Sequence, residues 1–212
     1  EYRYDWGDGT ISAWGDATQT HTWQITGMFY VRAQARCIAN PSVLSTWSSV
    51  KSIVVSEPPV VPTIHYVSTI GTPVSPYTNW ATAARTIQDA IHVCNDDDTV
   101  LVAEGIYNEN LIIEGKRITL ASQFVNDGDR AYIENTIIDG GASNRVVTYQ
   151  NIEGLAGRMV GFTITNGHAK GSTYPNFHGG GIACIAASPS LEHLVVSGNE
   201  ANEEGGGLYV QN

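Results

Sequence analysis

The stretch HGGGIACI at residues 178–185 recurs 26 residues later as EGGGLYVQ at 204–211. The preceding segments repeat as well: GFTITNG (161–167) aligns with HLVVSGN (193–199) at a separation of 32, and TIIDGG (136–141) precedes FTITNG by 26. The separation of 32 becomes 26 once a six-residue insertion in HAKGSTYPNF (168–177) is removed. A constant repeat in this length range is typical of a chain that coils and stacks equivalent positions on one another.

The apolar residues alternate inside these matched segments, which favours strands. Phe162 and Ile164, like Leu194 and Val196, lie two positions apart and should face the same side of a strand. One such unit cannot bury its apolar side alone, so it must stack on its neighbours. We therefore predict an all-β solenoid, a parallel β-helix. We expect it to be right-handed because crossovers between parallel strands almost always are.

Composition and charge narrow the choice of partners. The 212 residues, 42% hydrophobic, are enough for one or two domains with a sizeable core. The net charge is −10, and residues 58–212 contribute seven basic and 16 acidic side chains. Nucleic-acid binders need a basic surface, so this acidic part argues against such a partner. No stretch is apolar for long enough to span a membrane, and no signal peptide opens the chain.

A proline-rich segment divides the chain. In SEPPVVPT (56–63), three prolines fall within five positions, which breaks regular structure and stiffens a short connection. We predict a first domain over 1–56, a linker over 57–63 and the β-helix over 64–212. The first domain should contain about half the strands of an immunoglobulin-like sandwich. Its expected elements are strands EYRYDW (1–6), THTWQ (20–24), FYVRAQAR (29–36) and VKSIVV (50–55), with a tight hairpin at GDGT (7–10).

The motifs YRYDWGDGT (2–10), THTW (20–23), GMFYVRAQA (27–35) and STWSSVKSIVV (45–55) together resemble a polycystic-kidney-disease-type (PKD) module, an immunoglobulin-like domain. In that family two further strands precede the WGDG turn. The resemblance therefore implies that this chain is a window from a longer polypeptide.

The second part should begin with an end cap. In ATAARTIQDAIHVC (81–94), one helical face is apolar and the other polar, which predicts an amphipathic helix. The apolar face comprises Ile87, Ala90, Ile91 and Cys94, and the polar face Arg85, Gln88, Asp89 and His92. Asn95 suits a left-handed C-terminal cap. This helix, the stretch DDTVLVAEGIYNENLIIEGKRITLAS (97–122) and the GGGI and GGGL repeats resemble the secreted right-handed β-helices of the pectate-lyase-like superfamily. That resemblance implies an architecture that carries lyases, hydrolases and adhesins alike.

One acidic cluster is a candidate metal site. Asp96, Asp97 and Asp98 offer the hard oxygen ligands that calcium prefers. The alternative is a solvated turn whose side chains bond to their own backbone. No cofactor is expected otherwise. The three cysteines (Cys37, Cys94, Cys184) have no metal-binding spacing, and we expect buried thiols.

No catalytic residues are assigned. A lyase on this scaffold would need carboxylates stacked on neighbouring turns, but the stacked positions are Asp139, Thr165 and Ser197. We expect Arg145 and Arg158 to be charges at strand edges. The histidines His168, His178 and His193 have no metal-binding spacing, and we expect each of them to be an exposed loop or face residue.

The insertion carries the candidate binding residues. HAKGSTYPNFH (168–178) places Tyr174, Phe177, His168 and His178 on a bulge from an otherwise even surface. Aromatic side chains on protruding loops often contact carbohydrate or protein. The alternative is that they fold back to cover the side of one turn.

These features favour a non-catalytic segment of a large extracellular or cell-surface protein, acting as stalk, spacer or adhesive module, with a glycan or another surface protein as partner. One alternative is a polysaccharide lyase or hydrolase whose active turns lie beyond residue 212. Another is a self-assembling extracellular fibre subunit, because exposed strand edges at both ends would allow self-association.

Overall fold

The computed structural model describes residues 1–57, 61–152 and 157–211. The chain divides into two compact units, Glu1–Val60 (unit 1) and Val61–Asn212 (unit 2). Residues 58–60 of the predicted linker lie outside the described residues. No helix in the described part has the length and apolar character of a membrane span; α1, for instance, has seven residues.

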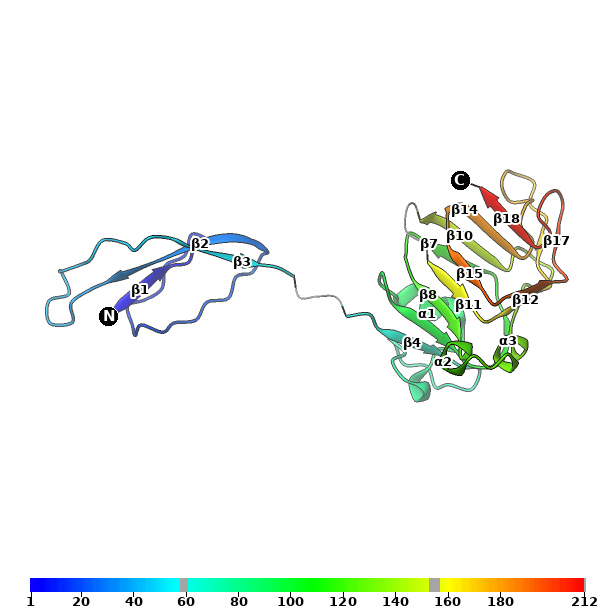
Figure 1. The fold of residues 1–212 in the computed structure, drawn as a ribbon, viewed down its shortest axis with the longest axis horizontal. Coiled ribbons are helices and arrows are strands. Elements are labelled where there is room, and N and C mark those ends of the chain that lie inside the picture. Colours follow the sequence, from blue (N-terminus) through cyan, green and yellow to red (C-terminus); the bar gives the residue numbers. More distant parts are fainter. Residues whose placement is uncertain (58–60, 153–156, 212) are drawn as a thin grey trace. The chain divides into compact units, whose positions relative to one another are not determined.

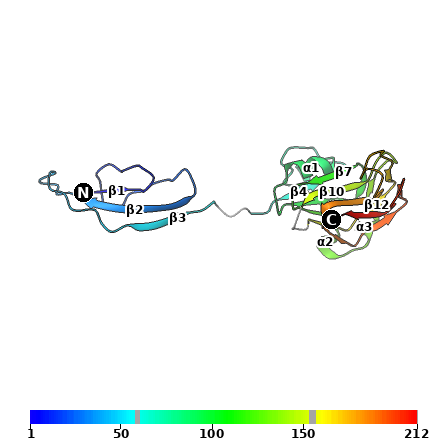
Figure 2. The ribbon, with the colours of Figure 1, turned by 90° about the horizontal axis from the view of Figure 1, so that it is seen from above.

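Unit 1 contains one antiparallel sheet in the order β1-β2-β3, formed by β1 (Tyr2–Asp5), β2 (Gly27–Ala35) and β3 (Lys51–Val55). Figure 2 shows β2 and β3 running alongside each other. The predicted strand at 20–24 does not form. Instead, two rings of that segment pack on Trp6: His21 stacks on it at 4.8 Å, and Trp23 meets it edge-on at 6.0 Å.

The predicted turn at 7–10 is present but does not join two long strands. Gly7 and Gly9 have φ of 77° and 89°, and the Trp6 amide donates to the Thr10 carbonyl at 3.1 Å. The returning segment pairs with β1 only through isolated bridges at Ile11 and Gly15. β1 finds its continuous partner in β2 instead.

Arginine and tryptophan side chains stabilise the sheet of unit 1, whose buried apolar side chains include Trp6 and Phe29. The Arg3 guanidinium lies 4.6 Å from the centre of the Trp14 ring and 5.2 Å from that of Trp47. Arg36 and Arg32 cover the same two rings, at 4.7 and 4.9 Å. Each such cation–π contact contributes roughly 0.5–1 kcal/mol at an exposed site, so the alternating row reinforces a small core.

Unit 2 is built from parallel strands whose partners come from successive passes of the chain (Figure 1). The first sheet contains β4 (Ile64–Val67), β5 (Thr99–Val102), β8 (Thr119–Ser122), β11 (Arg158–Val160) and β15 (Ser190–Glu192). The second contains β6 (Gly105–Asn108), β9 (Thr136–Asp139), β12 (Thr163–Thr165) and β16 (Val195–Ser197). The third contains β7 (Leu111–Glu114), β10 (Val147–Ile152), β14 (Ile182–Ala187) and β18 (Leu208–Gln211). A short pair, β13 (His168–Ala169) and β17 (Glu200–Ala201), lies after the second sheet.

The pairing register matches the sequence repeat. Thr163 lies opposite both Ile137 and Val195, and Ile182 lies opposite Leu208, which are the separations of 26, 32 and 26 found in the sequence. This coiled stacking of parallel strands is the arrangement of a β-helix. Phe162 and Ile164 are both buried inside it, as predicted.

The glycine run at 179–181 serves the close approach of neighbouring turns. A Cβ on Gly180 would overlap the carbonyl oxygen of Glu200 on the next turn. The amides of the three glycines donate across to the carbonyls of Glu204, Gly205 and Gly206 at 3.1, 3.1 and 2.9 Å. The run is therefore a corner between turns, as its recurrence suggests.

The end-cap helix is shorter than predicted. α1 covers Ile87–Val93, and a single 3-10 turn (η1, Trp80–Thr82) precedes it. The helix begins after Thr86, whose hydroxyl accepts from the Asp89 amide at 3.2 Å. The segment just before the helix is extended, because Ala84 bridges to Val67 of β4. The apolar face is buried as predicted.

The predicted left-handed cap is displaced along the chain. The helix ends at an extended Cys94, and it is Asp97 rather than Asn95 that has a positive φ, of 71°. Two short helices, α2 (Phe124–Asp127) and α3 (Ala131–Asn135), follow β8, and α2 ends at a left-handed Gly128.

Candidate functional site

The insertion is fixed to unit 2 by a buried arginine. Arg145, predicted to be a charge at a strand edge, lies two residues before β10 and is buried, at 6% exposed. Its Nε donates to the His178 carbonyl at 2.8 Å, and its Nη2 donates to the Pro175 carbonyl. The guanidinium thus replaces the backbone partners that an irregular loop lacks. Arg158, in contrast, is partly exposed at the strand surface, where it pairs with Glu192 at 2.7 Å.

His178 is also buried, at 5% exposed, which corrects its predicted exposure. Its ring stacks on Tyr209 of β18 at 4.5 Å with 10° between the planes. Its Nδ1 accepts the Glu204 amide at 3.1 Å, so this nitrogen carries no proton in the folded protein. The insertion folds back onto the next turn and buries this side chain.

The four predicted binding residues are only partly brought together. Tyr174 is 56% exposed, and its hydroxyl lies 3.3 Å from that of Tyr209. Phe177 is half-buried, with its ring edge-on to His178 at 4.5 Å. His168 lies apart from this cluster, with Nε2 at 3.2 Å from the Asn202 carboxamide oxygen. Tyr174 is therefore the exposed member, whereas Phe177 and His178 anchor the loop.

A groove lies beside the insertion, between its residues Lys170, Gly171 and Asn176 and the strands β7 and β10. It has a volume of about 390 Å³ and is lined by Asn110, Leu111, Ile112, Ser143, Asn144, Arg145, Thr148, Gln150, Lys170, Gly171 and Asn176. A second groove of about 460 Å³ shares Asn110 and Ile112 with it and extends toward α1. Sequence reasoning did not find this groove, because its walls come from four separate segments.

Backbone hydrogen bonds hold the groove's polar side chains in place. The side-chain nitrogen of Asn110 (Nδ2) donates to the carbonyls of Arg145 and Gly140 at 2.7 and 3.2 Å. Lys170 donates to the Ala142 carbonyl at 2.9 Å. Ile112 of β7, which is 50% exposed, adds an apolar side chain to this mostly polar lining. Polar groups fixed on a concave surface are what orient a ligand in a small-molecule or sugar site.

The three aspartates of the candidate calcium site do not converge. Asp96 accepts the Arg117 amide at 2.8 Å, and Asp97 pairs with the Arg117 guanidinium at 2.5 Å. The hydrogen bond from Arg117 lowers the pKa of Asp97. Asp98 points inward instead and is 1% exposed.

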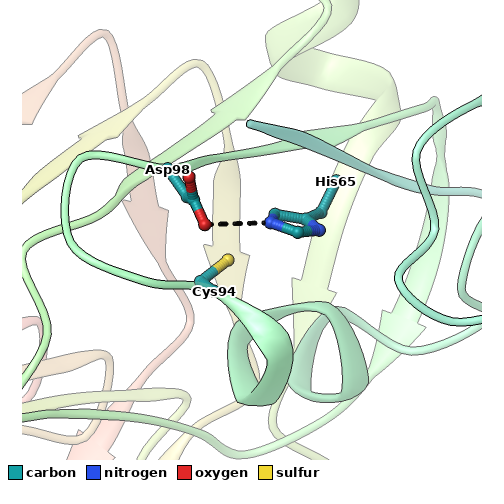
Figure 3. A group of neighbouring side chains, drawn as sticks. All are labelled: His65, Cys94 and Asp98. Atoms are coloured by element: carbon teal, nitrogen blue, oxygen red, sulfur yellow. Dashed lines mark hydrogen bonds and ion pairs between the residues drawn. The ribbon is translucent and has the colours of Figure 1, made fainter. Parts of the chain in front are cut away.

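Asp98 meets His65 and Cys94 inside the cap (Figure 3). Its Oδ2 lies 3.1 Å from His65 Nε2, and the Cys94 thiol donates to the Ala90 carbonyl at 3.2 Å. Burial raises the pKa of Cys94 to about 12, and the nearby Asp98 adds to the effect. Burial alone would raise the pKa of Asp98, but the Thr63 and Asn95 amides and His65 lower it on balance. The sequence gives little sign of this cluster, since His65 is 33 residues from Asp98.

The remaining thiols differ from each other. Cys184 is buried, as predicted, but Cys37 is exposed, which corrects the expectation for that residue. Cys37 lies two residues beyond the end of β2, outside the strands of unit 1.

The stacked row Asp139, Thr165 and Ser197 is in register, as predicted. Asp139 is the carboxylate of this row. Its Oδ1 accepts from the Asn166 side chain at 2.8 Å and from the Gly141 amide at 2.7 Å. This carboxylate therefore stabilises a corner of the coil.

Comparisons with known proteins give a limited result. No family model matches the chain, and no curated protein matches its sequence. Among solved structures, the chain is similar to one described as a pectin methylesterase in complex with hexasaccharide VII, at 16% sequence identity and a TM-score of 0.47. The match covers 71% of this chain and 46% of that protein, so the chain spans less than half of its length.

Proposed function

We propose that this chain is a non-catalytic segment of a large extracellular or cell-surface protein. In this proposal unit 1 is a PKD-type, immunoglobulin-like module, unit 2 is a right-handed β-helix that acts as stalk or spacer, and the groove beneath the insertion binds a glycan. The observation that carries the proposal is the groove itself, whose lining combines the exposed Ile112 side chain with amide, hydroxyl and ammonium groups.

The composition of the rim supports a sugar ligand. Sugars present hydroxyl groups that both donate and accept hydrogen bonds, and Gln150 and Asn176 offer side-chain amides with the same dual capacity. The apolar face of a pyranose ring can cover an exposed aliphatic or aromatic side chain. Ile112 offers such a surface in the groove, and Tyr174 offers another on the insertion.

The row Asp139, Thr165 and Ser197 favours binding over lysis. Three stacked residues provide one carboxylate there, and hydrogen bonds already engage it within the coil. A polysaccharide lyase or hydrolase with active turns beyond residue 212 is the second candidate. Turnover of a uronate-rich polysaccharide by this chain would favour that candidate.

Glycan-array binding by the intact chain tests the proposal. Ile112→Arg places a larger, charged side chain in the groove. It should weaken glycan binding at least tenfold, which corresponds to a loss of about 1.4 kcal/mol of binding free energy. Ile106→Arg is the matched control, because Ile106 is similarly exposed (59% against 50%) but lies on β6 in another sheet. The proposal fails if no glycan binds the unmodified chain, or if the Ile112→Arg and Ile106→Arg variants bind the glycan equally well.

A further inference from the structure

Three metal-ligating side chains meet in the buried cap of unit 2, and the groove does not use them. His65 comes from β4, Cys94 from the end of α1, and Asp98 from the residue before β5 (Figure 3). They are 3%, 3% and 1% exposed. One ligand atom from each lies within 4.8 Å of the others.

The imidazole of His65 is oriented as a ligand would be. Its Nδ1 lies 2.7 Å from the Pro76 carbonyl, which can only accept, so Nδ1 carries a proton and Nε2 faces the cluster. A hydrogen bond from the second ring nitrogen to a backbone carbonyl is the usual way in which proteins fix a metal-binding histidine.

The carboxylate of Asp98 is held in the same manner. Its Oδ1 accepts the Thr63 amide at 2.7 Å, and its Oδ2 accepts the Asn95 amide at 2.7 Å. Both bonds come from backbone groups, so they fix the carboxylate's position without occupying any other side chain. Hydrogen bonds to backbone groups thus hold two of the three metal-ligating side chains, His65 and Asp98, in place.

We propose that His65 Nε2, Cys94 Sγ and Asp98 Oδ2 bind one borderline-soft divalent cation, with Zn²⁺ as the best match. A sulfur, nitrogen and oxygen set of this kind suits zinc, whereas calcium takes oxygen ligands alone. Two ligands of a tetrahedral zinc ion, each about 2.0–2.1 Å from it, lie roughly 3.3 Å apart. The observed separation of 3.1 Å between Nε2 and Oδ2 is close to that value. The Ala90 carbonyl, 3.2 Å from Sγ, is a further oxygen beside the cluster.

Binding would exchange a proton for the ion. In the metal-free protein the Cys94 thiol donates a hydrogen bond to the Ala90 carbonyl and therefore carries its proton. A metal–sulfur bond replaces that proton, which passes to solvent. Affinity therefore rises with pH. Because the ligands come from β4, α1 and the start of β5, the ion also ties the first turn of unit 2 to its cap.

Cobalt substitution of the intact chain tests this site. The exposed Cys37 is first replaced by Ser so that it cannot bind metal. Titration with Co²⁺ should saturate at one equivalent and produce thiolate-to-cobalt absorption together with the visible bands of tetrahedral cobalt, and Zn²⁺ should displace the cobalt. Calorimetry in two buffers of different ionisation enthalpy should show net proton release on metal binding.

Two cysteine variants provide the contrast. Cys94→Ala should abolish the thiolate absorption and weaken Zn²⁺ binding about 100-fold or more, because a ligand is lost. Cys184→Ala, which removes another buried thiol, should leave the thiolate absorption and the Zn²⁺ affinity unchanged. If Cys94→Ala does not fold, Cys94→Ser should fold and still lack the thiolate absorption. An unmodified chain that takes up no Co²⁺ or Zn²⁺, or thiolate absorption that persists without Cys94, overturns the proposal.

Discussion

Replacing Asp98 by Asn should strongly destabilise unit 2, although the side chain keeps its shape. The carboxylate is 1% exposed and accepts hydrogen bonds from Thr63, Asn95 and His65. An asparagine oxygen can retain the bond at Oδ1, but its NH₂ group would face the Asn95 amide, whose N–H would then be buried without an acceptor. The substitution also removes the negative charge that faces His65 Nε2.

The size of the effect follows from these losses. Each buried donor left without an acceptor costs about 1–3 kcal/mol, and removing one partner of a buried pair costs about 3–5 kcal/mol in all. For a domain of about 150 residues, 1 kcal/mol lowers the melting temperature by about 2–4 °C. We therefore expect a decrease of about 10 °C for the transition of unit 2.

Urea and thermal unfolding followed by circular dichroism, with chelator present, would measure this effect. The pH dependence has a defined sign. Because the pKa of Asp98 is lowered in the folded state, its contribution is complete above the unfolded value of about 4 and is lost as the pH falls toward the folded pKa. The difference in stability between the original chain and the variant should therefore be constant near pH 7 and shrink below pH of about 4.

Asp97→Asn is the matched control. The adjacent Asp97 side chain is 54% exposed and pairs with Arg117 at the surface, where ion pairs contribute little. The Asp97→Asn substitution should leave the melting temperature of unit 2 equal to that of the original chain within experimental error. Equal effects of the two substitutions, or a pH-independent difference for Asp98→Asn, would refute the argument that the buried carboxylate organises the cap.

Three further predictions concern other parts of the chain. Gly180→Ala should prevent unit 2 from folding normally in circular dichroism, since its Cβ overlaps a neighbouring carbonyl, whereas Gly207→Ala should fold, because its Cβ would make an ordinary 3.5 Å contact. In the native protein, Cys37 should be the thiol that reacts with a disulfide reagent, and all three should react in denaturant; rapid native labelling of more than one would contradict the burial. Phe177→Ala should lower the melting temperature more than Tyr174→Ala, because Phe177 packs on a buried ring while Tyr174 is 56% exposed; the reverse order would contradict the assigned roles.

Local sequence patterns predicted much of unit 2. The repeat separations of 26 and 32 residues set the strand register, because stacked turns must place like residues side by side. The spacing of Ile87, Ala90, Ile91 and Cys94 predicted the buried face of the cap helix. The start of that helix was placed too early, since the pairing of Ala84 with β4 overrides the helical propensity of the residues before Thr86.

The contacts between segments that are distant in the sequence could not be predicted from the sequence. The sequence alone determined that the chain coils into parallel strands, because periodicity and glycine corners are local properties. Only the tertiary structure decided that Arg145 and His178 are buried, that the groove forms beside the insertion, and that Asp98 faces His65 and Cys94 while Asp97 faces solvent. The physical reason is that burial depends on which turn lies against which, and a single strand or loop carries no record of the side chains that another turn places beside it.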